Sequence, residues 1–119
     1  MISVFLAGSI GVVWRHADLS RALDKQGISV THIHAGDHKI DGNPAQPLPE
    51  EVRADFQAEV DALYGIFVET VAINRGVTEE AVRDTQARVY LGQDGVQTGL
   101  ADRIETADRF INISCATFS

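Results

Sequence analysis

The sequence contains a single cysteine, Cys115, among its 119 residues. One thiol cannot form a disulfide within the chain, and it cannot build a zinc site that needs several cysteine ligands. Because chains without disulfides are typical of reducing compartments, we expect a cytoplasmic protein.

Positive charge is also scarce, with 10 Lys and Arg residues against 17 Asp and Glu residues and a formal net charge of −7. Nucleic-acid phosphates and anionic membrane surfaces both select for clustered lysine and arginine. The charge balance therefore argues against nucleic acid and against an anionic membrane as direct partners.

Long apolar runs are absent as well, and a helix that spans a bilayer needs about 20 apolar residues. The uncharged stretch Met1–Trp14 lacks the basic residues that begin a signal peptide, and Gly8, Ser9 and Gly11 interrupt it. We predict that this stretch forms two short buried strands, or one strand and a turn. The sequence also has no internal repeat and no low-complexity segment.

What is present is an ordinary globular composition, with 45% apolar and 23% charged residues. A chain of this length allows one domain with its own core. The segments Gly11–Trp14 and Ile28–His34 are predicted as strands, the second of them buried on both faces. Between them, Asp18–Gln26 is predicted as a helix that Gly27 ends. A strand, a helix and a strand in succession predict a βαβ unit and a parallel sheet.

One long helix dominates the second half of the sequence. A loop from Ala35 to Leu48 comes first, and Pro49 then occupies a typical first helical position. Apolar residues recur at spacings of three and four, which predicts an amphipathic helix of about 25 residues that ends at Gly76. These residues are Val52, Phe56, Val60, Leu63, Phe67 and Val71. The elements predicted after it are a short helix capped by Thr78, strands at Arg88–Leu91 and Leu100–Ile104, and helical turns at Gln93–Thr98.

The densest polar cluster, His32–Asp41, begins at the end of a predicted strand and continues into the loop, where α/β proteins place their sites. One alternative is a metal site, with His32 and His34 on one strand face and His38 or Asp41 as a further ligand. The spacing is not a recognised zinc signature. For a strand buried on both faces, neutral core histidines with backbone partners are the commoner outcome.

The other candidate in this cluster is Lys39, whose default role is a solvated surface charge. An unperturbed lysine has a pKa of about 10.4, so a lysine base at neutral pH needs a pKa lowered by roughly 3 units. Burial against apolar walls would lower it, whereas contact with Asp37 or Asp41 would raise it. These two carboxylates must therefore point away from Lys39 if it is a base.

No serine in the sequence is an obvious nucleophile. Lysine bases serve serine nucleophiles in Ser–Lys variants of the catalytic triad. Ser9, in Gly8-Ser9-Ile10-Gly11, has a glycine-flanked setting suited to close polar contacts. Its glycines do not have the offsets of the Gly-x-Ser-x-Gly elbow.

Four segments occur in an order and at spacings that are typical of one family. They are Gly8–Val13, Gly36–Pro44 with its Gly36-Asp37-His38-Lys39 start, Leu48–Arg53, and Val89–Asp102. Together they resemble the signal peptide peptidase A-like serine peptidases, and within that family the branch of phage capsid-assembly proteases. The similarity extends over residues 8–108.

The resemblance implies a crotonase-like (caseinolytic-protease-like) α/β fold and an endopeptidase with a Ser–Lys dyad, without a cofactor or a metal ion. Lys39 matches the general base of the family, and Ser9 matches the serine that hydrogen-bonds this lysine and holds it in place. The resemblance also implies a homo-oligomer assembled in part through the helix after Pro49. It further implies a peptide or capsid scaffold protein as partner, in a bacterial host or a phage prohead.

The departures from the family matter as much as the match. The family's nucleophilic serine and the backbone of its oxyanion hole lie further towards the N-terminus than this chain reaches, and Leu91 stands where Ser or Thr is usual. We therefore expect residues 1–7 not to match, residues 8–108 to form the carboxyl half of the peptidase domain, and residues 109–119 to be a tail. We expect this partial fold to be inactive alone. The rival hypothesis is a non-enzymatic oligomerisation or capsid-binding module, and a metal-dependent hydrolase is the third.

Overall fold

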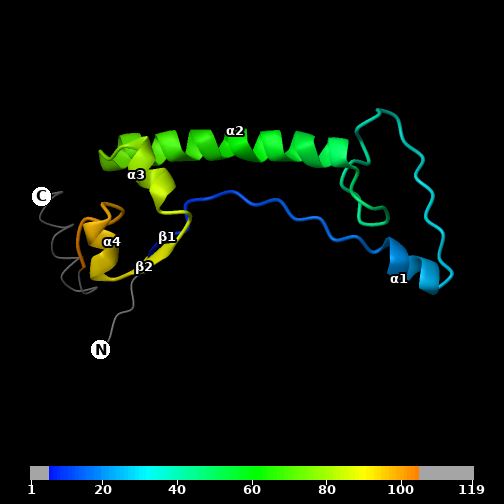
Figure 1. Cartoon of the computed structure of the whole chain (residues 1–119), viewed down its shortest axis with the longest axis horizontal. Helices are drawn as coiled ribbons and strands as arrows, with labels where there is room; N and C mark the ends of the chain where they lie inside the picture. Colours follow the sequence, from blue (N-terminus) through cyan, green and yellow to red (C-terminus); the bar gives the residue numbers. More distant parts are fainter. Residues whose placement is uncertain (1–5, 105–119) are drawn as a thin grey trace, which may run out of the picture. The chain divides into compact units, whose positions relative to one another are not determined.

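The computed structural model describes residues 6–104, which contain four helices and two short strands (Figure 1). In chain order they are β1 (Leu6–Gly8), α1 (Ser20–Lys25), α2 (Glu50–Arg75), α3 (Glu79–Asp84), β2 (Val89–Leu91) and α4 (Gln93–Gln97). The described residues form two compact units, one of residues 12–65 and the other of residues 6–11 and 66–104. The expected tail at 109–119, with Cys115, lies outside the described residues, as do residues 1–5.

The long helix predicted after Pro49 is confirmed as α2, which has 26 residues. Glu50 and Glu51 lie in its first turn and Arg75 in its last turn, so the charges at both ends complement the helix dipole. Its existence and both of its ends therefore follow from local sequence signals.

Two valines form the centre of the core in the unit that contains residues 66–104. Val68 on α2 and Val82 on α3 are 0% and 1% exposed, and Thr85 beside α3 is 7% exposed. The Thr85 hydroxyl donates to the Val82 carbonyl oxygen at 2.7 Å, so its burial leaves no unpaired polar group. The Thr78 side chain accepts the N–H of Ala81 at 3.0 Å, which confirms Thr78 as the cap of α3.

Arg75 ties the end of α2 to the segment that follows α4. Its Nε donates to the Gly99 carbonyl oxygen at 2.7 Å, and its Nη2 donates to the Asp102 carboxylate at 2.7 Å. This hydrogen bond, and then the arginine charge, lowers the pKa of Asp102. The C-terminal part of the Val89–Asp102 segment is therefore anchored to the long helix.

The sheet found among the described residues pairs β1 with β2 in antiparallel orientation, with Leu6 opposite Leu91 and Gly8 opposite Val89. The strand predicted at Arg88–Leu91 is thus confirmed within one residue. Its partner is the N-terminal stretch, so the pairing joins segments that are far apart in the sequence.

The predicted parallel βαβ unit is not formed in this structure. Gly11–Trp14 and Ile28–His34 are without regular secondary structure, and so is the predicted strand Leu100–Ile104. A strand buried on both faces needs neighbouring strands, and residues 6–104 supply none for the first two segments. Val13 and Ile33 are consequently 84% and 97% exposed.

The helix predicted between these segments is present but shorter, as α1. The Asp18 carboxylate accepts the N–H of Ser20 at 2.9 Å, and this hydrogen bond lowers the pKa of Asp18. Among residues 6–104, no helix combines the length and the apolar character that crossing a bilayer requires.

Candidate active site

Lys39 lies in a series of backbone turns, residues 36–43, which we call the lysine turn. The N–H of Lys39 donates to the Gly36 carbonyl oxygen at 3.2 Å, and the N–H of Asn43 donates to that of Ile40 at 3.1 Å. The side-chain Nδ2 of Asn43 also donates to the Ile40 carbonyl oxygen at 2.8 Å, and the side-chain Oδ1 of Asn43 accepts the N–H of Ala45 at 3.1 Å. The Gly-Asn-Pro continuation of the motif therefore folds the backbone that carries the lysine.

The carboxylates near Lys39 in the sequence form no ion pair with it among the described residues. Asp41 accepts a hydrogen bond from Nδ1 of His38 at 2.8 Å, and among residues 6–104 the ion pairs do not include Lys39. The side chain of Lys39 is exposed. The arrangement thus avoids the carboxylate contact that would oppose a lysine base, but the described residues do not bury the amine.

The His38–Asp41 pair raises the pKa of His38, first through the hydrogen bond and then through the carboxylate charge, with smaller contributions from Asp55 and Asp37. We predict that Asp41→Asn lowers the pKa of His38 towards the ordinary histidine value of about 6.5. Asp37→Asn is the matched control and should lower it less. A titration of the His38 ring protons by NMR measures both.

The raised pKa of His38 determines how the stability of the lysine turn depends on pH. The pair stabilises the folded lysine turn fully below the histidine pKa of the unfolded chain, and this stabilisation is lost as the pH rises through the folded value. Equal His38 titration curves for the wild type and Asp41→Asn would show that the pair does not form in solution.

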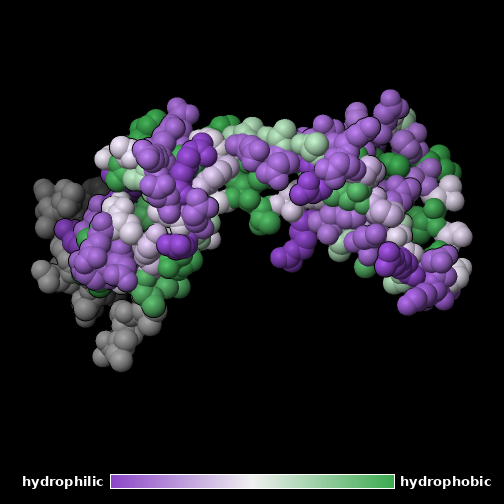
Figure 2. Space-filling model, viewed as in Figure 1, coloured by the Kyte–Doolittle hydropathy of each residue, from purple (hydrophilic) through white to green (hydrophobic). Residues whose placement is uncertain are grey.

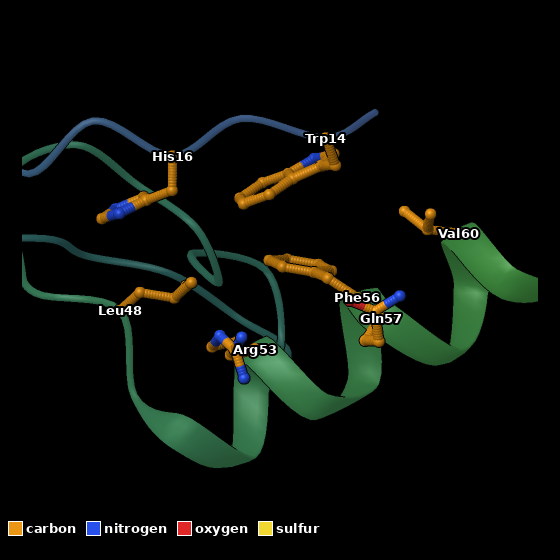
Figure 3. Close-up of a pocket in the computed structure, with 7 residues that line it drawn as sticks. All are labelled: Trp14, His16, Leu48, Arg53, Phe56, Gln57 and Val60. Carbon is orange, nitrogen blue, oxygen red and sulfur yellow. The ribbon is translucent and has the colours of Figure 1, made fainter. Parts of the chain in front are cut away.

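Aromatic rings hold the lysine turn against the start of α2 (Figure 3). The Trp14 and Phe56 rings pack with centroids 4.2 Å apart and planes tilted by 35°. Gly42, at a φ of +79°, lies so close that a Cβ there would be 2.8 Å from the Trp14 ring and 3.0 Å from that of Phe56. The segment before α1 adds two polar links: Nε2 of His16 donates to the Asn43 carbonyl oxygen at 3.0 Å, and Leu19 N–H donates to the Pro44 carbonyl oxygen at 2.8 Å.

Sequence reasoning missed this aromatic contact. Its available signals were that Trp14 is the only tryptophan of the chain and that a glycine sits inside the predicted loop. Neither signal identifies Phe56 as the partner, because the contact joins residues 14, 42 and 56.

Two cavities lie beside the lysine turn, both within residues 12–65. One, of about 370 Å³, is lined by Trp14, His16, Leu48, Arg53, Phe56, Gln57 and Val60 (Figure 3). The other, of about 510 Å³, is lined by His38, Asp41, Asp55, Phe56, Ala58 and Glu59. Neither is lined by Lys39, so the described residues present the lysine without enclosing it.

Ser9, the other candidate site residue, belongs to the unit of residues 6–11 and 66–104. It directly follows β1, and its N–H donates to the Arg88 carbonyl oxygen at 3.0 Å. Its φ is +61°, a left-handed conformation that is uncommon for serine and is often found where function constrains the backbone. Ser9 is exposed.

The histidine cluster does not form the metal site considered from the sequence. Nδ1 of His34 donates to the Gly36 carbonyl oxygen at 3.0 Å, and His38 is paired with Asp41. Within the described part of the chain, no three or more His, Cys, Asp or Glu side chains gather as metal ligands would. The alternative of His34 as a core residue is also wrong, because its side chain is exposed.

Comparison with known proteins gives matches over nearly the whole chain. The model of peptidase family S49 matches residues 3–114. Capsid assembly protease C of Escherichia phage lambda is 41% identical over 106 residues, which cover 89% of this chain and 24% of that protein. Head-tail preconnector protein GP5 of Enterobacteria phage P21 is 42% identical over 106 residues, which cover 89% of this chain and 21% of that protein. The chain thus spans less than a quarter of each phage relative.

Proposed function

The chain belongs to peptidase family S49, and on this premise we propose that it carries the lysine-bearing part of a serine endopeptidase with a Ser–Lys dyad. In this proposal Lys39 is the general base, and Ser9 is the serine that positions it in the complete protein, as the family resemblance implies. The family match over residues 3–114 carries the proposal. The fixed backbone of the lysine turn, with Asp41 paired to His38, supports it.

The reaction assigned to this site is the hydrolysis of a peptide bond. Lys39, neutral and desolvated, takes the proton of a serine hydroxyl as its oxygen attacks the scissile carbonyl carbon. It returns that proton to the leaving amine when the C–N bond breaks, and the acyl-enzyme is then hydrolysed by water. Backbone N–H groups stabilise the oxyanion.

The nucleophile and the walls that desolvate Lys39 are assigned to residues outside the 119 of this chain. Three observations support this: the exposed side chain of Lys39, the absence of Lys39 from the lining of the two cavities, and the share of the phage relatives that the chain spans. We therefore propose that the chain alone has no peptidase activity. The backbone of the lysine turn is folded, but the described residues leave the side chain of Lys39 exposed.

We assign the complete protein a crotonase-like α/β fold. The extended segments at residues 11–14 and 28–34 are then strands that gain neighbours only in the complete sheet. Their lack of regular structure and the exposure of Val13 and Ile33 support this, because β-rich apolar segments are rarely left open to water.

The partner of the complete protein is a peptide or a capsid scaffold protein. The name of the phage lambda relative, capsid assembly protease C, supports this assignment. We also propose that the complete protein assembles into homo-oligomers.

The second candidate function is a non-enzymatic oligomerisation or capsid-interaction module, and one surface of α2 favours it. Leu63, Ile66 and Ile73 are 55%, 62% and 73% exposed, and their spacings of three and seven place them on one face of the helix. Figure 2 shows apolar residues at the surface along α2. A row of this kind on a charged helix is typical of a surface that another helix covers.

A chimera distinguishes the two functions. We expect no casein hydrolysis by the purified 119-residue chain, and measurable hydrolysis when these residues replace the matching region of phage lambda capsid assembly protease C. The control is the same phage protein with that region deleted, which should be inactive. A soluble but inactive chimera, together with a defined oligomer of the isolated chain by light scattering, would overturn the peptidase proposal in favour of the module.

A further inference from the structure

We propose that Trp14 is a positioning residue for Lys39, which it orients by clamping the lysine turn onto the start of α2. The inference rests on the peptidase function proposed above. Trp14 lies 25 positions before Lys39 in the sequence, and the turn brings the two into the same unit of residues 12–65.

The backbone of the lysine turn meets the Trp14 ring at Gly42. At a φ of +79° and with no Cβ, Gly42 lets the backbone of the turn approach the Trp14 ring more closely than another residue could. The opposite wall is Phe56 on the second turn of α2, whose ring centroid is 4.2 Å from that of Trp14. The turn is thus held against the long helix by two rings, three residues beyond Lys39.

Polar links fix the segment that carries Trp14 to the end of the lysine turn. His16 donates to the carbonyl oxygen of Asn43, at 3.0 Å, and its ring is stacked on Trp14 with an interplanar angle of 6° and centroids 6.2 Å apart. The Leu19 N–H reaches the next carbonyl oxygen, that of Pro44, at 2.8 Å. Polar links at His16 and Leu19 therefore follow the Trp14 contact along the same segment.

Trp14 can act on the reaction through the position of Lys39. An indole neither takes nor gives a proton at neutral pH, so it cannot replace Lys39 in any proton transfer. A general base must lie within hydrogen-bond distance of the proton it removes, and a misplacement of about 1 Å can cost about 10²-fold in rate. Holding the turn is therefore enough to give Trp14 a large effect on catalysis.

The 119-residue chain itself tests whether Trp14 holds the turn. By NMR relaxation, we expect Trp14→Ala to lower the order parameters of the Lys39, Asp41 and Asn43 amides from about 0.85 to below about 0.6. Trp14→Phe keeps an aromatic ring and should retain values close to the wild type. Val13→Ala, at the adjacent and 84% exposed residue, is the matched control and should change none of them. Unchanged order parameters in Trp14→Ala would overturn the clamp.

The active chimera tests whether the clamp serves Lys39. We expect Trp14→Ala to lower kcat by about 10- to 100-fold with KM changed less than about threefold, and Trp14→Phe to restore kcat to within about threefold. A loss carried by KM, or no rescue by phenylalanine, would overturn the positioning role. These outcomes are distinct from failure of the peptidase function, which would appear as an inactive chimera while the NMR result still stands.

Discussion

Replacing Lys39 with alanine in the active chimera lowers kcat/KM by about 10²- to 10⁴-fold, the range that a positioned general base contributes. The reason is chemical: without the amine, no group of this chain lies in place to take the proton of the attacking hydroxyl. KM should change little, because the lysine acts on the nucleophile and not on the distant parts of the substrate. Steady-state hydrolysis of a quenched fluorescent peptide gives both parameters.

Two further variants make this result specific. Lys25 on α1 is the only other lysine of the chain, so Lys25→Ala removes the same charge at another exposed position and should leave kcat/KM unchanged. Lys39→Arg keeps the charge, but a guanidinium is not deprotonated in proteins, so it should be as inactive as Lys39→Ala. A Lys39→Ala chimera with more than about a tenth of the parent activity would rule Lys39 out as the base.

The elements that depend on neighbouring residues in the sequence could be predicted well. The periodic apolar positions, the acidic first turn and Pro49 predict α2, and Thr78 predicts the start of α3. Each of these signals acts within one or two helical turns, so it does not depend on residues that are remote in the sequence. The lysine turn belongs to the same class, since Gly36 and Asn43 make local hydrogen bonds that fold it.

The parallel sheet could not be predicted in the same way, because a strand is completed by residues that are remote in the sequence. Ile28–His34 has the composition of a strand, yet the described chain gives it no neighbour. β2 formed because a partner, β1, is present in this chain. Of the strands predicted from composition, the one at Arg88–Leu91 formed, because its partner β1 is present in the described chain.

The candidate site likewise combines contacts that are present in this chain with an exposed Lys39. The residues that hold Lys39 in place are local or lie within the unit of residues 12–65, and they are present. The described residues do not bury the side chain of Lys39, just as they give Ile28–His34 no neighbouring strand. Lys39 and Ile33 are accordingly both exposed, and under the function proposed above both would be covered by further elements of the sheet.

The largest effect on stability is expected from Gly42→Ala, because two separate penalties act there. The positive φ costs an L-residue about 1–2 kcal/mol, and the new methyl group must displace the Trp14 ring, at about 1–3 kcal/mol for an overpacked contact. We expect a decrease in the free energy of unfolding of about 2–5 kcal/mol for residues 12–65. The fluorescence of Trp14, the only tryptophan, reports this directly in urea titrations and should shift to longer wavelength.

Gly27→Ala separates the two penalties. Gly27 has a φ of +70°, but a Cβ there would meet nothing within 4 Å, so the variant pays only the backbone cost of about 1–2 kcal/mol. The difference between the two variants measures the contact of the turn with the rings, and only Gly42→Ala should change the emission of Trp14. If both variants unfold at the same urea concentration with the same emission, the lysine turn is not packed against Trp14, and the placement of Lys39 must then depend on its backbone hydrogen bonds alone.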